Sequence, residues 1–417
     1  MSFELILVLN ECLKLIILFI NMLNLFKNTK LSQFIASPDK YLRLDEPLQR
    51  SRFDQAEREI TQWPRYQQTP LLSLTGLARA VNIEEIHYKH EGSRFGLGSF
   101  KALGGAYAVL RVIQKNLSSA AGRTVSLKEI REHKFRTKVA DITVTSATDG
   151  NHGRSVAWGA KLFGVKCRIY IHAEVSEYRA QSMRDLGAEV VRVSGNYDAA
   201  VARTREDAKI HNWNIVSDTS WPGYTSIPLD VMAGYGVMAR EIVRQLEEPP
   251  THVFLQGGVG ALAAAIAASF NQEWLDQAPI NVIVEPEFAP CLFVSAKNGK
   301  ATAFKVEKET MMAGLSCGEP SEIAWPILSS SVKNYLTIPD SLVAPTIRML
   351  ANPDNGDSAL EAGESAVAGL CGLLCAATQD ELRESLELTN QSRVLIIGSE
   401  GVTDPHIFKT IMSEKGV

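Results

Sequence analysis

Lys101 is the residue whose surroundings most strongly suggest covalent chemistry. It follows Ser99-Phe100 and precedes small and apolar residues whose spacing predicts an amphipathic helix over about 101–115. A lysine at a helix start is unusual, because the positive end of the helix dipole repels an ammonium group. A lysine held there as an imine to a carbonyl cofactor would avoid that repulsion. Taken alone, the stretch favours the alternative of an exposed lysine with a solvated amine.

A polar loop flanked by glycines follows the strand predicted at residues 142–145. Its sequence is Ser146-Ala147-Thr148-Asp149-Gly150-Asn151-His152-Gly153. Glycines let the backbone approach a ligand closely and expose several N–H groups, which together can bind a carboxylate. An ordinary turn followed by a helix N-cap explains the same residues equally well.

A second glycine turn, Gly257-Gly258-Val259-Gly260, lies between a predicted strand and a predicted helix. The N–H groups at a helix start can bind a phosphate. The turn also fits the relaxed dinucleotide pattern G-x-G-x-x-A, and Glu285 ends the following strand, where a ribose-binding acid would stand. A nicotinamide-dependent oxidoreductase is therefore a competing prediction. Against it, the turn lies beyond the midpoint of the chain, far from the usual first strand of such a domain.

The elements that must position these loops alternate regularly. Strand, loop and helix repeat from residue 141 to about 216, and the pattern resumes from 231 to 397. Such alternation predicts parallel sheets with helices on both faces. We therefore predict an α/β fold made of two doubly wound, parallel-sheet domains. In sheets of this kind, ligands bind where strands end.

The composition excludes several classes of function. The chain has 417 residues, of which 45% are hydrophobic and 22% charged, an ordinary balance for a globular protein. Its net charge of −4 gives no basic surface for a nucleic acid. The six cysteines lack the paired spacing of a zinc site or a disulfide scaffold. We therefore predict no metal centre and a reducing, cytoplasmic location.

The first thirty residues are unusually apolar. Their polar residues would fall on one narrow stripe of a helix. Glu11 and Lys14 interrupt the apolar run, which is too short for a membrane-spanning helix, and Glu4 is atypical of a signal peptide. Three interpretations remain: a helix packed on the body or on a dimer partner, a helix on a membrane surface, and a disordered extension. We prefer the first or the third to membrane contact.

Together, these motifs resemble those of the fold-type II pyridoxal-phosphate enzymes, the tryptophan synthase β-like family. In that family a Ser-x-Lys forms a Schiff base with the cofactor, and an Asn loop holds the ring hydroxyl and the substrate carboxylate. A glycine loop takes the phosphate, and a late Ser or Thr meets the pyridine nitrogen. This chain has the four motifs in the same order, within a resemblance that covers about residue 60 to the end. It implies Lys101, Asn151, Gly257, Gly258, Val259, Gly260 and Ser399 as cofactor ligands, and Thr148, Gly150, Asn151, His152 and Gly153 as substrate ligands.

Within this family the chain most resembles the diaminopropionate ammonia-lyases. Asp149 distinguishes its Asn loop from that of the serine and threonine dehydratases, which have a small residue there. The resemblance implies conversion of 2,3-diaminopropionate to pyruvate and ammonia. A dehydratase-type lyase on the same fold is the alternative. The stretches that carry the likeness are 95–107, 147–154, 195–198 and 312–320.

The resemblance also implies catalytic roles. Lys101 would act as the base on one face of the substrate and Asp149 on the other, which would allow both enantiomers to react. Asp198 would bind the β-ammonium group that leaves. Glu285 would either contact the cofactor's imine or merely cap a strand.

The same resemblance implies how the chain is divided. Residues 38–104 together with 226–417 would form a large cofactor-binding domain. Residues 105–225 would form a small α/β domain that carries the Asn loop, with pyridoxal phosphate in the cleft between the two. Residues 1–37 would be an apolar extension of uncertain order. The expected partners are a small amino-acid substrate and a second copy of the chain in a homodimer.

Overall fold

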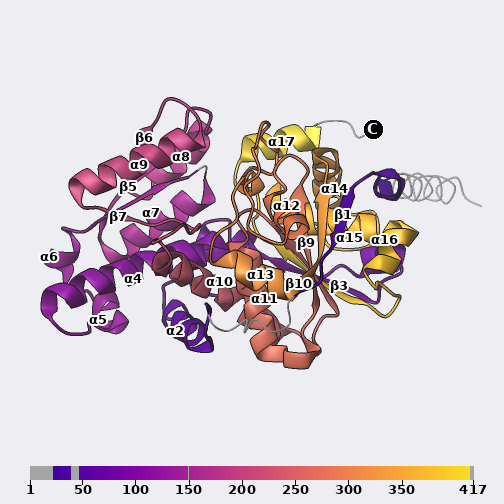
Figure 1. Ribbon diagram of the computed structural model, residues 1–417, viewed down its shortest axis with the longest axis horizontal. Helices are drawn as coiled ribbons and strands as arrows, with labels where there is room; N and C mark the ends of the chain where they lie inside the picture. The colour runs from indigo at the N-terminus through magenta and orange to yellow at the C-terminus, as the bar shows by residue number, and fades with distance from the viewer. Residues whose placement is uncertain (1–21, 39–46, 149, 414–417) are drawn as a thin grey trace, which may run out of the picture.

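The computed structural model describes residues 22–38, 47–148 and 150–413. These residues form two sheets, one of seven strands and one of four. Figure 1 shows the smaller sheet with its magenta helices on the left and the larger sheet on the right. Strands alternate with helices throughout both parts, so the predicted α/β fold is confirmed. Among the described helices, none has the length and apolar character needed to cross a membrane.

The smaller sheet is wholly parallel, with strand order β6-β5-β4-β7. Its connections are helices, as a parallel sheet requires. All of its strands and helices belong to residues 143–215, within the predicted small domain. The strands are β4 (Thr143–Ala147), β5 (Lys166–Ile171), β6 (Glu189–Arg192) and β7 (Asn214–Ile215), and the helices are α7 (Asn151–Phe163), α8 (Glu177–Arg184) and α9 (Tyr197–His211).

The larger sheet has the order β1-β10-β9-β8-β11-β3-β2, and its two edge strands run antiparallel to their neighbours. Neither edge strand nor β10 is predicted from the sequence. Because β1 is hydrogen-bonded to β10, the end of the predicted N-terminal extension is part of this sheet. The strands are β1 (Ser32–Ile35), β2 (Leu71–Ser73), β3 (Glu85–His90), β8 (His252–Gln256), β9 (Ile280–Pro286), β10 (Val332–Ile338) and β11 (Arg393–Gly398).

Both faces of the larger sheet are covered, as the side chains of β11 show. Leu395 and Ile397 belong to one buried apolar cluster, whereas Val394 and Ile396 belong to another. Alternate residues of a strand point to opposite faces, so the sheet separates two cores. The other helices that pack around the sheets, in chain order, are α2 (Arg50–Ile60), α3 (Thr75–Ala80), α4 (Lys101–Ala121), α5 (Leu127–Arg131), α6 (Arg136–Val139), α10 (Ser226–Gln245), α11 (Ala261–Trp274), α12 (Cys291–Asn298), α13 (Ala324–Ser331), α14 (Val343–Ala351), α15 (Ala368–Thr378), α16 (Asp380–Ser385) and α17 (Pro405–Ser413).

Helix α4 joins the two halves of the molecule and fixes the place of Lys101. A Cβ atom on Gly234 of α10 would come within 2.5 Å of the Leu103 carbonyl oxygen. A Cβ atom on Gly105 would come within 1.8 Å of the Ser155 Oγ atom in α7. Glycine is therefore required at both helix crossings, because any side chain would push the helices apart. The close packing holds the start of α4 between the two sheets.

Part of the apolar N-terminal segment packs on the body. Residues 22–28 are helical, and Phe26 is fully buried in a core cluster. The Gln379 side chain donates hydrogen bonds to the Phe26 carbonyl oxygen at 2.7 Å and the Thr29 carbonyl oxygen at 3.0 Å. These contacts agree with the first of the three interpretations for this part of the segment. Residues 1–21 lie outside the described residues.

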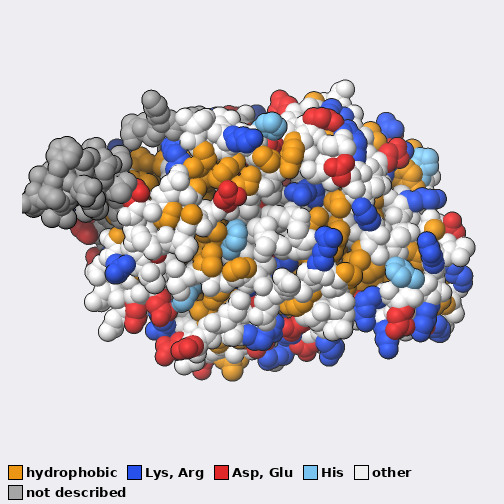
Figure 2. All heavy atoms as spheres, turned by 180° about the vertical axis from the view of Figure 1, so that it is seen from behind, with side chains coloured by type: hydrophobic (Ala, Val, Ile, Leu, Met, Phe, Trp, Pro, Cys, Tyr) orange, Lys and Arg blue, Asp and Glu red, His pale blue; other side chains and the backbone are white. Residues whose placement is uncertain are grey.

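The surface seen in Figure 2 mixes both signs of charge. Lys and Arg side chains stand among Asp, Glu and apolar ones over most of this face. The mixture is consistent with a net charge of −4.

Candidate active site

The amine of Lys101 is paired with a carboxylate rather than solvated. Lys101 is the first residue of α4, and its Nζ atom lies 2.5 Å from Oδ2 of Asp218. Burial lowers the pKa of Lys101, but the charge and hydrogen bond of the Asp218 carboxylate raise it by more. The net effect is a raised pKa. Burial likewise raises the pKa of Asp218, yet the charges of His152 and Lys101 outweigh it and hold that pKa well below its usual range. The pair is therefore an ion pair at neutral pH.

Asp218 is not among the site residues predicted from the sequence. The residue lies three positions after β7, which is only two residues long. The available signal was its position just beyond the carboxyl end of a strand in a parallel sheet, where ligand-binding residues gather. Nothing in its neighbours, Ser217 and Thr219, matched a motif.

The loop before Lys101 is clamped to the end of β11. Phe100 donates its backbone N–H to the Ser399 carbonyl oxygen at 3.0 Å, and Gly401 donates to that of Gly98 at 3.0 Å. Gly98 adopts a φ of 77°, which favours glycine. Lys101 and Ser399, which are 298 positions apart in the sequence, are thereby held on adjacent segments.

The Asn loop is closed by its own threonine. Thr148 Oγ1 accepts N–H bonds from Gly150 and Gly153, both at 3.1 Å. Helix α7 then begins at Asn151 without a side-chain cap, so its first backbone N–H groups remain available to an anion. The Asn151 amide donates to Oε2 of Glu400. Asp149 lies outside the described residues.

His152 is buried and directed at the neighbouring strand rather than into the loop. Its Nε2 atom lies 2.9 Å from the Val216 carbonyl oxygen, and its Nδ1 atom lies 3.6 Å from Oδ2 of Asp218. Burial lowers the pKa of His152. These contacts make it a packing residue behind Asp218, and they give no support to its predicted contact with substrate.

The glycine turn after β8 has the form of a phosphate cradle. Gly258 and Gly260 have φ angles of 60° and 92°, and α11 starts at Ala261 without a side-chain cap. A Cβ atom on Gly257 would come within 2.3 Å of Cγ of Glu285. Only glycine fits there, and the N–H groups at the helix start are left without intrahelical partners. These features fit the phosphate of the predicted cofactor.

The Glu285 carboxyl group caps the start of helix α12. Its two carboxylate oxygens accept the N–H groups of Leu292 at 3.0 Å and Phe293 at 2.7 Å, at the start of α12. Burial raises the pKa of Glu285 to about 8. The carboxyl group therefore holds α12 in place, which argues against the ribose-binding role that an oxidoreductase would need.

Glu400 connects the two halves of the site and was also missed. Its Oε1 atom accepts the Ser365 N–H at 3.1 Å, and its Oε2 atom accepts the Asn151 amide. Both Glu400 and its neighbour Ser399 are buried. The Asn loop of the smaller sheet is thus tied to the end of β11 in the larger one.

Asp198 stands apart from this group. It is exposed in the first turn of α9, which is capped by Asn196. Within the described ranges, no hydrogen bond or ion pair joins Asp198 to the residues around Lys101. The site that the structure assembles contains Lys101, Asn151, Asp218, Ser399 and Glu400.

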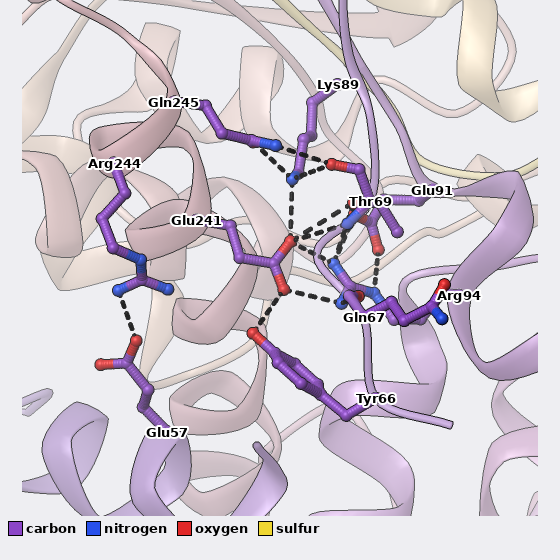
Figure 3. A network of polar contacts seen from close by, with 10 residues as sticks. All are labelled: Glu57, Tyr66, Gln67, Thr69, Lys89, Glu91, Arg94, Glu241, Arg244 and Gln245. Carbon is purple, nitrogen blue, oxygen red and sulfur yellow. Dashed lines mark hydrogen bonds and ion pairs between the residues drawn. The ribbon is translucent and has the colours of Figure 1, made fainter. Parts of the chain in front are cut away.

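A buried ionic cluster supports the loop that leads to Lys101 (Figure 3). Glu241 of α10 lies 2.8 Å from Nζ of Lys89 in β3 and 2.7 Å from Nη2 of Arg94. Arg94 also pairs with Glu91 at 2.8 Å. The two cations balance the two carboxylates, and Thr69 donates to Glu91 at 2.5 Å. The cluster fixes residues 89–94, which form the start of the segment that leads to Lys101.

Comparisons with known proteins agree with the site. A family model described as pyridoxal-phosphate dependent enzyme matches residues 63–400. The diaminopropionate ammonia-lyase of Escherichia coli (strain K12) is 37% identical over 356 residues, which are 84% of this chain and 88% of that protein. The holo crystal structure of the Escherichia coli enzyme with selenomethionine has a TM-score of 0.83 and 33% identity, and covers 92% of this chain and 97% of that one. Its structure in complex with D-serine gives the same TM-score of 0.83 and 33% identity over 92% and 97% of the two chains.

Proposed function

Because the chain belongs to the pyridoxal-phosphate-dependent enzymes, we propose that it is an ammonia-lyase that converts 2,3-diaminopropionate and water to pyruvate and two molecules of ammonia. The observation that carries the proposal is the Lys101–Asp218 pair, held beside the Asn loop and Ser399. Relatives that are 37% identical to this chain over 356 aligned residues and bear the name diaminopropionate ammonia-lyase support the choice of substrate.

The residues present fit pyridoxal phosphate. The glycine turn Gly257–Gly260 and the start of α11 would hold its phosphate, Asn151 its ring hydroxyl, Ser399 its pyridine nitrogen and Lys101 its carbonyl carbon. When bound, the cofactor withdraws electrons from the substrate's Cα and so makes the Cα proton removable. A hydroxyl such as that of Ser399 cannot keep the ring nitrogen fully protonated as an aspartate would, which favours elimination over transamination.

Each protein group then has a physical task. The open N–H groups at the start of α7 bind the substrate's carboxylate. When its nitrogen is bound to the cofactor's carbonyl carbon, Lys101 would not carry the proton that it has in the ion pair with Asp218. Once the substrate's amine displaces it, the neutral Lys101 amine would take the Cα proton, and the Asp218 carboxylate would stabilise the ammonium that results. The β-nitrogen leaves as ammonia. The enamine that is released takes up water and loses the second ammonia, which leaves pyruvate. One substrate and one water thus give pyruvate and two molecules of ammonia.

An assay of products tests this proposal directly. We expect pyruvate and two equivalents of ammonia from DL-2,3-diaminopropionate, measured with purified protein and added pyridoxal phosphate. Serine and threonine serve as competing substrates, because the alternative dehydratase-type lyase would convert them to 2-oxo acids. Conversion of threonine without any turnover of diaminopropionate would establish the alternative.

The proposal for a second base is tested by Asp149→Asn. Asp149 lies outside the described residues, so its part rests on the sequence. We expect turnover of one enantiomer of diaminopropionate to fall by about 10²–10⁴-fold, the usual contribution of a general base, while the other enantiomer reacts through Lys101. The measurement is kcat/KM for each pure enantiomer. An equal loss with both would contradict the two-base idea.

We also propose that the protein acts as a homodimer in the cytoplasm. The homodimer follows from the family likeness. The location is supported by the cysteines, because all five within the described residues are free thiols, as expected of a reducing compartment.

A further inference from the structure

The hydroxyl of Tyr224 binds the backbone that leads to Asp218. It donates a hydrogen bond to the Ile215 carbonyl oxygen at 2.9 Å and accepts one from the Ser217 N–H at 3.0 Å. Both backbone groups belong to the end of β7, which has only two residues and lies at the edge of the smaller sheet. An edge strand has no neighbouring strand on its outer side to pair with such groups. The tyrosine therefore supplies the partners that a further strand would provide.

A tight turn directs the Tyr224 side chain back towards β7. Trp221 and Tyr224 exchange backbone hydrogen bonds at 3.4 and 2.8 Å. Gly223, between them, has a φ of 83°, which favours glycine. The rings of Trp221 and Tyr224 are stacked, with their centroids 4.0 Å apart. The turn and the stacking together fix the direction of the ring, so that its hydroxyl reaches Ser217, seven positions earlier in the chain.

The residue between the two groups that Tyr224 binds is held from the opposite side. Val216 donates its N–H to the Thr145 carbonyl oxygen of β4 at 2.8 Å, and its own carbonyl oxygen lies 2.9 Å from Nε2 of His152. Val216 is thus held on the inner side of the strand, and its two neighbours are held on the outer side by Tyr224. Asp218 is the next residue after this double attachment.

A second attachment lies beyond Asp218. The Ser220 Oγ atom lies 2.7 Å from the Ser321 Oγ atom. Ser321 in turn donates its N–H to the carbonyl oxygen of Val259, in the glycine turn, at 2.8 Å. The short segment that carries Asp218 is therefore fixed at one end by Tyr224 and at the other end to the turn that would hold the cofactor's phosphate.

We propose that Tyr224 is a positioning residue whose hydroxyl keeps the Asp218 carboxylate against the Lys101 amine. The two side chains are 2.5 Å apart, and their exposed fractions are 22% for Lys101 and 19% for Asp218. Water would therefore replace the carboxylate beside the amine if the Asp218 segment moved. The Tyr224 hydroxyl bonds backbone groups rather than Lys101 itself, so it acts through Asp218. The inference deepens the proposed function and rests on it wherever turnover is measured.

The proton affinity of Lys101 reports the place of Asp218. Burial lowers the pKa of Lys101, and the charge and hydrogen bond of Asp218 more than offset this effect. If Asp218 moved away, the burial effect would remain without its largest counterweight, so the pKa of Lys101 would fall. The other titratable groups that interact with the pair are unchanged when Tyr224 is replaced. They are His152 of α7, Tyr235 of α10, Cys317, and Glu400 after β11.

The variant Tyr224→Phe keeps the stacked ring and removes the hydroxyl. In the full-length protein without cofactor, we expect its Lys101 to react with trinitrobenzenesulfonate at lower pH than in the parent, because the pKa of the amine falls. Peptide mass spectrometry across a pH series measures this shift. In the holoenzyme, we expect kcat for 2,3-diaminopropionate to fall by about 10- to 100-fold, since a displacement of about 1 Å can cost that much. KM should change little, because the hydroxyl does not bind the substrate.

A double variant shows whether Tyr224 acts through Asp218. Asp218→Asn removes the carboxylate charge, and it should lower both the pKa of Lys101 and kcat on its own. If Tyr224 acts through that carboxylate, then adding Tyr224→Phe to Asp218→Asn should reduce kcat no further. Losses that multiply in the double variant would overturn the inference.

Tyr170→Phe is the matched control for lost stability. Tyr170 is a buried tyrosine in β5 of the same sheet, and its hydroxyl donates to Asp207. Its loss should lower the melting temperature and leave kcat and the pKa of Lys101 unchanged. The same behaviour in Tyr224→Phe would show that Tyr224 only supports the fold, and would overturn the inference alone. Failure of the parent to turn over diaminopropionate would overturn the proposed function, whereas the labelling of Lys101 would still decide the role of Tyr224.

Discussion

Replacing Lys101 by alanine is expected to abolish turnover and the covalent retention of pyridoxal phosphate. The amine at this position is the group that would bind the cofactor's carbonyl carbon, and it is held for that purpose beside Asp218 at 2.5 Å. Proton transfer by a positioned side chain is alone worth about 10²–10⁴-fold, so losing the amine should cost at least that much in kcat. Borohydride reduction followed by peptide mass spectrometry reads the attachment directly, without reference to activity.

Two variants control this experiment. Lys115→Ala removes an exposed lysine from the same helix and should keep both the cofactor label and full turnover. Lys101→Arg keeps a cation beside Asp218 but cannot bond to a carbonyl carbon, so it should fold and remain unlabelled. Retention of the label on another lysine in Lys101→Ala would refute the assignment.

The ligand loops were predictable because each is a local signal. Lys101, the Asn loop and the turn Gly257–Gly260 combine residue types and spacings that physical chemistry links to a function, and their order along the chain carried the family likeness. Asp218 has no such local signal. An isolated acid after a two-residue strand looks like any polar turn residue until the fold brings it near a lysine.

The fold was predictable to the same extent and for the same reason. Buried parallel strands such as β8 and β11 appear as short apolar runs, so the two sheets could be foreseen. The edge strands could not. β2 has three residues and β1 has four, and neither shows the alternation or β-branched content that marks a strand. Their pairing partners are 14 or more positions away, which no short window of sequence contains.

Glu241→Gln is expected to lower the free energy of unfolding by about 3–5 kcal/mol, because removal of one partner leaves a buried charge uncompensated. Lys89 and Arg94 would then share only Glu91, and the cluster would carry a net positive charge among fully buried side chains. The measurement is urea denaturation of the holoenzyme at neutral pH. Glu307→Gln is the control, because its ion pair with Lys305 at 3.2 Å is exposed and should be worth no more than about 1 kcal/mol.

The difference in unfolding free energy between the parent and Glu241→Gln should depend on pH. This dependence shows whether Glu241 stabilises the fold through its charge or through its packing. Burial raises the pKa of Glu241, but the hydrogen bonds and charges of Arg94 and Lys89 outweigh it and bring the pKa down from 4.5 to about 2. The stabilisation from a depressed acid pKa is fully present above pH 4.5 and is lost as the pH falls towards 2. Lys89 offsets part of it, because burial lowers its pKa and so penalises its charged form. The stabilities of parent and Glu241→Gln should therefore converge between pH 4.5 and pH 2, whereas a gap that persists unchanged would mean that the glutamate acts through its shape.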